Sequence, residues 1–116
     1  MLLDTDKNRL FHMVQAAEQA IAYAEQHNIE EVKNSPPLQH LLIRNLEILG
    51  EAAARVTTEF REAHPEIPWR NMIDMRNRLI HAYFDTNLNI IWETVQKSLP
   101  PALKLLRDLL EKENSQ

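Results

Sequence analysis

The chain has 116 residues, of which 44% are hydrophobic and 26% are charged. This length suits a single domain over residues 1–116 with one core and leaves too little chain for a second core. The absence of cysteine excludes disulfides, thiolate metal sites and a cysteine nucleophile. A formal charge of −4 excludes a general electrostatic coat for nucleic acid, so any contact with a polyanion must be local.

The apolar residues are interrupted by polar ones throughout the chain. No run of about 18 uncharged apolar residues is present, so no segment is expected to cross a membrane. The N-terminus reaches Asp4 after two leucines and lacks the basic-then-apolar order of a secretory signal. We therefore expect a soluble, cytoplasmic protein.

The chain has a single glycine and few clusters of β-branched residues, which disfavours sheets with tight hairpins and favours helices. In the N-terminal half the apolar spacing predicts two long helices. The first helix follows possible caps at positions 4–6 and ends near Asn28. The second begins at Ser35, a capping hydroxyl that precedes two prolines. Gly50 lies inside this helix, and we expect another helix to approach closely there. The expected core positions are Leu10, Val14, Ala17, Ile21, Ala24, Leu38, Leu41, Leu42, Leu46, Leu49, Ala52, Ala53 and Val56.

The C-terminal half predicts further helices separated by prolines. A short helical turn at residues 59–63 precedes two prolines, and Trp69 opens a third long helix that runs through Tyr83. Residues 85–87 supply the turn and cap of a fourth helix, which Pro100 and Pro101 end, and a last helix follows. The fold class predicted is all-α, an up-and-down bundle of four main helices plus a short extra helix.

The third long helix carries the candidate chemistry. At 100° per residue, Arg76 falls in the middle of a broad apolar face, while Asp74, Asn77, Arg78 and His81 share the opposite stripe. An arginine on an apolar face is usually a snorkelling or ion-paired residue, and a lone histidine on a helix is usually structural. A functional role for His81 is favoured only if neighbouring residues could position a substrate beside it.

The run Arg76-Asn77-Arg78-Leu79-Ile80-His81-Ala82-Tyr83 resembles the signature of HEPN ribonucleases, and the tyrosine narrows this to the HepT-like toxins. Upstream and downstream segments resemble the same family in the same order, so the resemblance covers nearly the whole chain. They are Arg44 to Ala52, His64 to Arg70, Ile91-Trp92 and Leu99-Pro100.

The resemblance implies a metal-independent endoribonuclease that needs no cofactor, because RNA carries its own nucleophile in the 2′-hydroxyl. His81 would move the proton and Arg76 would hold the phosphoryl oxygens in the transition state. Asn77 would orient His81 or the phosphate. The candidates for guiding the RNA backbone are Arg78, Arg70 and Arg44.

The resemblance also implies partners. Arg76 and His81 point about 140° apart on an ideal helix, so one helix presents them poorly to one phosphate. A homodimer whose two signature helices meet would bring both residues of both chains into one cleft. The family's partner is a minimal nucleotidyltransferase antitoxin that silences the toxin by adding AMP to a tyrosine, here Tyr83. Without the family resemblance, Tyr83 would be interpreted as a structural residue whose ring lies in the core and whose hydroxyl lies at its edge.

Two other readings stay open from the sequence. A non-catalytic helical subunit that binds and regulates a nucleotidyltransferase is favoured slightly by the acidic balance, and Asp74 stands near the site where a carboxylate could repel phosphate. A metal protein built on Asp74, His81, Glu47 and Glu51 is disfavoured, because the chain has no paired Glu-x-x-His or His-Glu-x-x-His spacing.

Overall fold

The computed structural model describes residues 4–81 and 87–114, and it describes only the backbone of Asp4 and His81. Its elements in chain order are α1 (Asp4–Glu25), α2 (Ile29–Lys33), α3 (Pro36–Arg55), α4 (Thr58–Ala63), α5 (Trp69–His81), α6 (Leu88–Glu93), the π-helical segment η2 (Thr94–Ser98) and α7 (Leu99–Asn114). The described residues form no strand, so the predicted all-α class is confirmed.

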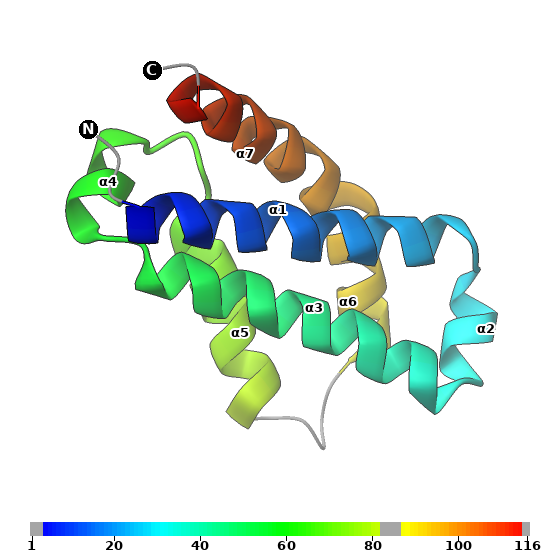
Figure 1. Ribbon diagram of the computed structural model, residues 1–116. Helices are drawn as coiled ribbons and strands as arrows, with labels where there is room; N and C mark the ends of the chain where they lie inside the picture. Colours follow the sequence, from blue (N-terminus) through cyan, green and yellow to red (C-terminus); the bar gives the residue numbers. More distant parts are fainter. Residues whose placement is uncertain (1–3, 82–86, 115–116) are drawn as a thin grey trace.

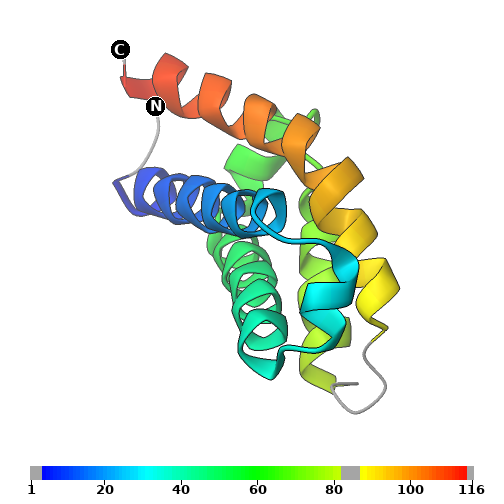
Figure 2. The ribbon, with the colours of Figure 1, turned by 90° about the vertical axis from the view of Figure 1, so that its right-hand side faces the viewer.

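The long helices form a bundle in which α3 is central. It runs antiparallel to α1 and packs against α1 on one side and α5 on the other. The chain then returns through α6 and η2 to α7, which packs across α1 and ends on the side of the molecule where α1 begins (Figures 1 and 2). None of the helices in the described ranges is long and apolar enough to span a membrane.

Local signals explain where the helices begin. The Ser35 hydroxyl accepts a hydrogen bond from the Leu38 N–H at 3.4 Å, which confirms the predicted start of α3. Asn87 caps α6 by accepting from the N–H groups of Asn89 and Ile90. The short helix α2 was not expected from the sequence. A capping box between Asn28 and Glu31, the third residue of the helix, stabilises its start.

The prediction that Pro100 and Pro101 end a helix is wrong. The helical path continues from α6 through η2 into α7, and both prolines lie in the first turn of α7. Proline has no N–H to donate to the preceding turn, and at η2 the Leu99 N–H bonds to the Thr94 carbonyl, five residues back, instead of four. Because of the wider π turn before the prolines, α6, η2 and α7 form one continuous helical path, where two separate helices were expected.

The predicted apolar stripes form one buried cluster to which α1, α3, α5, η2 and α7 contribute. Leu41, expected in the core, is only half-buried and lies outside this cluster. Helical spacing places Ile80 on the apolar face of α5, yet 36% of it is exposed near the end of the helix. Asp6 departs from its expected capping role. Its buried carboxylate accepts from the Thr57 N–H at 2.9 Å and the Thr57 hydroxyl at 2.8 Å. This contact fixes the residue that caps α4 to the first turn of α1.

Candidate active site on the signature helix

Gly50 of α3 determines how closely α5 approaches. A Cβ atom at position 50 would lie 2.5 Å from the Met72 carbonyl oxygen and closer still to the Cβ atom of Arg76. The predicted close approach of another helix at Gly50 is therefore confirmed. The Arg76 stem packs directly against Gly50, and this contact accounts for the place of Arg76 on the apolar face of α5.

The stem and the head of Arg76 have different surroundings. The side chain is half-buried, and its Nε is buried with no hydrogen-bond partner among the described residues. Its Nη1 donates to Asn77 Oδ1 at 3.1 Å. The guanidinium is thus turned away from the core contact with α3 and toward the neighbouring polar stripe of α5.

That polar stripe connects Arg76 with the position of His81. Asn77 and His81 are four residues apart on the same helix, which places them on one face. Because the Arg76 head is bonded to Asn77, the angle of about 140° between the Cα–Cβ directions of Arg76 and His81 overstates the separation of their functional groups. The side chain of His81 and all of Tyr83 lie outside the described residues, so their predicted roles are untested.

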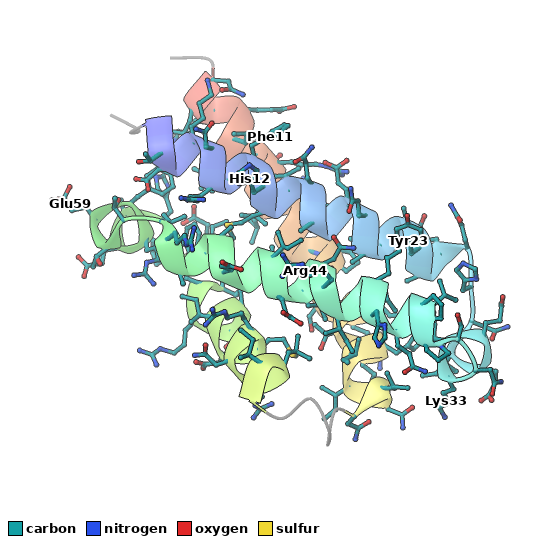
Figure 3. All side chains as sticks on the ribbon, turned by 60° about the horizontal axis from the view of Figure 1, so that its bottom comes forward. Phe11, His12, Tyr23, Lys33, Arg44 and Glu59 are labelled. Atoms are coloured by element: carbon teal, nitrogen blue, oxygen red, sulfur yellow. The ribbon has the colours of Figure 1, made fainter. Side chains whose placement is uncertain are left out.

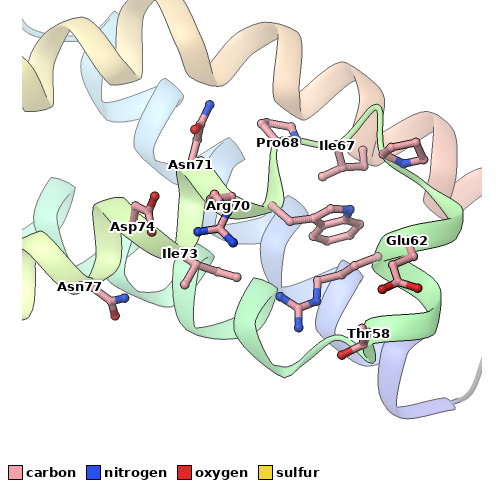
Figure 4. Close-up of a pocket in the computed structure, with 12 residues that line it drawn as sticks. Thr58, Glu62, Ile67, Pro68, Arg70, Asn71, Ile73, Asp74 and Asn77 are labelled. Carbon is pink, nitrogen blue, oxygen red and sulfur yellow. The ribbon is translucent and has the colours of Figure 1, made fainter.

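Asp74 and Asn77 of the polar stripe line an open cleft of about 790 Å³ between α4 and α5. Arg70, Ile73, Asp74 and Asn77 come from α5, and Thr58, Arg61 and Glu62 come from α4. Figure 4 shows the α5 residues on one side and Thr58 and Glu62 on the other. Residues 65–69 line one end of the cleft. There the Trp69 ring packs edge-on against the Phe60 ring, with 6.4 Å between the ring centroids.

The predicted RNA-guiding arginines occupy different places. Arg70 lines the cleft and is exposed, and Arg78 is exposed on α5 outside the cleft lining. Arg44 lies on α3, where it forms an ion pair with Glu47 at 3.8 Å and takes no part in the cleft. Figure 3 shows Arg44 on the side of α3 near α1.

Sequence reasoning missed Arg61, which lines the cleft opposite Arg70. No helical spacing connects the two residues, because they belong to different helices. The signal that could have found Arg61 is the short connection at residues 64–68. Because this connection is so short, α4 must lie close to the start of α5.

The titratable groups of the cleft do not gather into a metal site. Among the side chains that the structure describes, no three His, Asp or Glu residues come close enough to hold a metal ion. The described side chains of the cleft offer the cationic groups of Arg61 and Arg70, the carboxylates of Glu62 and Asp74 and the amide of Asn77.

Comparison with known proteins identifies the family. A sequence model of the family described as "Ribonuclease HepT-like" matches residues 13–109. A candidate RNase of Caldanaerobacter subterraneus is 38% identical over 111 residues, which cover 96% of this chain and 99% of that protein. A candidate RNase of Methanocaldococcus jannaschii is 33% identical over 82% of this chain and 87% of its own length.

A third relative, from Thermococcus cleftensis, carries the name "Probable ribonuclease HepT" and is 48% identical over 62 residues, 53% of this chain and 56% of that protein. No solved structure gives a significant match. The family match spans α3 and α5, whose contact positions Arg76. This chain therefore belongs to the HepT-like ribonuclease family.

Proposed function

We propose that this protein is a metal-independent endoribonuclease whose catalytic residues are Arg76 and His81. The observation that supports this most is the path of the Arg76 side chain. Its stem packs against Gly50 of α3, while its head bonds to Asn77 on the stripe that leads to His81. None of the described carboxylates forms an ion pair with the Arg76 head, which bonds to the neutral Asn77 side chain and keeps further N–H donors for a phosphate.

The proposed reaction uses groups that RNA and this helix already hold. The 2′-hydroxyl attacks the adjacent phosphorus, its proton goes to His81, and the 5′-oxygen leaves with a proton returned by an imidazole. Arg76 stabilises the negative charge that grows on the phosphoryl oxygens. Asn77 holds the Arg76 head in place through the 3.1 Å hydrogen bond. The products are a 2′,3′-cyclic phosphate end and a 5′-hydroxyl end.

The direct test is cleavage of RNA in excess chelator by purified protein. His81→Ala and Arg76→Ala should each abolish cleavage and growth inhibition while helical circular dichroism stays unchanged. His12→Ala is the matched control, because His12 is exposed on α1 and lies outside the cleft. Full activity in either site variant would remove the catalytic pair, and no cleavage by the unmodified protein would favour the non-catalytic regulatory subunit.

We also propose that the active form is a homodimer in which the two copies of α5 meet. Ile80, exposed beside the signature residues, supplies apolar surface for that contact. A mixture of Arg76→Ala and His81→Ala chains tests this sharply. If each site takes Arg76 from one chain and His81 from the other, about half of the dimers are mixed and each has one intact site. About a quarter of the wild-type activity should return, whereas sites within one chain would recover none.

The regulation proposed for this cytoplasmic toxin is addition of AMP to Tyr83 by a nucleotidyltransferase antitoxin. Tyr83 lies two residues beyond His81, so a nucleotide on its phenol oxygen would bring bulk and negative charge close to the substrate phosphate. Co-expression with the nucleotidyltransferase and peptide mass spectrometry should find AMP on Tyr83, and Tyr83→Phe should remain toxic. Modification confined to Tyr23, which is 37% exposed on α1, would refute this assignment.

A further inference from the structure

We propose that the cleft between α4 and α5 is a binding subsite for a nucleotide that flanks the cleavage position in single-stranded RNA, with Arg61 and Arg70 holding its phosphate. The proposal rests on the proposed ribonuclease function and names how that function's substrate is bound. It adds a residue, Arg61, and an element, α4, that the signature on α5 does not contain.

The state of Arg61 is the first argument. Its side chain is half-buried, its Nε is buried without a hydrogen-bond partner, and it makes no ion pair with any described carboxylate. A cation that is partly removed from water and left without a counter-charge costs free energy. An anion bound in the cleft would offset this cost. Arg61 and Arg76 are the two described residues with such an orphaned nitrogen. Arg61 lines the same cleft as Asp74 and Asn77, and Arg76 donates to Asn77.

The position of Arg70 is the second argument. It is exposed, lines the same cleft and likewise lacks an ion pair within the described part of the chain. Asn77 follows Arg70 by seven positions on the helix, which amounts to about 10 Å along the axis. This spacing exceeds the reach of one phosphate group but suits a neighbouring nucleotide of an extended strand. The cleft therefore continues the proposed catalytic stripe and does not duplicate it.

The carboxylates of the cleft decide which anion fits. Glu62 and Asp74 line it beside the two arginines, so it carries both signs of charge and is not a general phosphate trap. A ribonucleotide presents acceptors on its phosphate and donors on its 2′-hydroxyl and base amino groups. Arginine matches the first kind of group and carboxylates match the second. A charge-balanced cleft of this kind also agrees with the acidic net charge of the chain.

The test measures binding and cleavage separately. Binding of a short labelled single-stranded RNA is measured with the full chain carrying His81→Ala, so that cleavage does not interfere. Arg61→Gln should raise the Kd roughly tenfold, and it should lower the slope of log K against log salt by about 0.7. Arg107→Gln is the control, because Arg107 lies on α7 and pairs with Glu18 at 3.3 Å. It should leave the Kd within about twofold.

Cleavage by the chain with His81 intact gives the second readout. Arg61→Gln should reduce kcat/KM on the oligonucleotide about tenfold and leave cleavage of a dinucleoside monophosphate unchanged, because that substrate does not reach the subsite. Exposed Arg70→Gln repeats the test if Arg61→Gln does not fold. Unchanged RNA affinity in the Arg70 variant, or equal losses on both substrates, would overturn the proposal. DNA of the same sequence that binds as tightly as RNA would overturn it too. If the unmodified chain cleaves nothing, the binding arm still decides whether the subsite exists.

Discussion

Replacing Gly50 by alanine should destabilise this protein, although alanine favours helices. In an open helix the change would add about 1 kcal/mol of stability. Here the new methyl would meet the Met72 carbonyl oxygen at 2.5 Å, and the main-chain carbonyl has no side-chain freedom with which to move away. Ordinary contacts begin near 3.5 Å, so α5 would have to retreat by about 1 Å. Overpacking of this kind costs about 1–3 kcal/mol. Subtracting the propensity gain from this cost leaves a net loss in the free energy of unfolding of about 0–2 kcal/mol, centred at about 1 kcal/mol.

Urea unfolding followed by circular dichroism measures this loss, and RNA cleavage reports whether Arg76 has moved with α5. Ala54→Gly is the matched control, because Ala54 is exposed on the same helix and its replacement should cost only the propensity difference of about 1 kcal/mol. Opposite substitutions four residues apart should therefore both destabilise. A Gly50→Ala protein that is more stable than the original and cleaves RNA as fast would refute the close-contact reasoning.

Two further predictions concern α1 and α2. Asp6→Ala removes both acceptors of Thr57 and should lower the free energy of unfolding by about 2–4 kcal/mol in urea titration. Exposed Asp108→Ala should change it by less than about 0.5 kcal/mol, and equal effects would contradict the reasoning. The pKa of Glu31 lies below its usual value, mainly because the His27 side chain hydrogen-bonds to it. Its contribution to stability is therefore present above the unfolded-state pKa and lost as pH falls through the lower folded-state pKa. NMR titration should show this depression, and His27→Ala should reduce it.

The fold was largely predictable because its signals are local. Helical spacing gave the buried stripes, and the Ser35 cap marked the start of α3. The continuation of the helix through Pro100 and Pro101 was not predictable from proline chemistry, since a wider turn before the prolines replaces the hydrogen bonds that proline cannot make. The tertiary use of Asp6 was also hidden, because an acidic residue near a helix start looks the same whether it caps that helix or contacts Thr57 far along the chain.

The site divided in the same way. The polar stripe of α5 could be predicted from residue spacing on one helix. Arg61 could be assigned to the cleft only from the structure, which places α4 beside α5. Local periodicity relates residues within an element, and a cleft is a relation between elements. Arg44 illustrates the reverse case. It belongs to a segment that resembles the family, yet its guanidinium pairs with Glu47 on its own helix and lies apart from the cleft.

Gly50 and Arg76 connect the fold with the proposed chemistry. Considered alone, an arginine in the middle of an apolar face is unfavourable because burial of its charge costs free energy. A glycine in the middle of a helix is unfavourable because its helix propensity is low. Each resolves the other, because the missing side chain at position 50 leaves room for the Arg76 stem. The buried stem limits the positions that the head can take, and the hydrogen bond to Asn77 selects the one that faces the polar stripe. Helix propensity at Gly50 and full desolvation of an apolar face at Arg76 are thus given up, and the Arg76 head is directed toward the residues proposed to act on RNA.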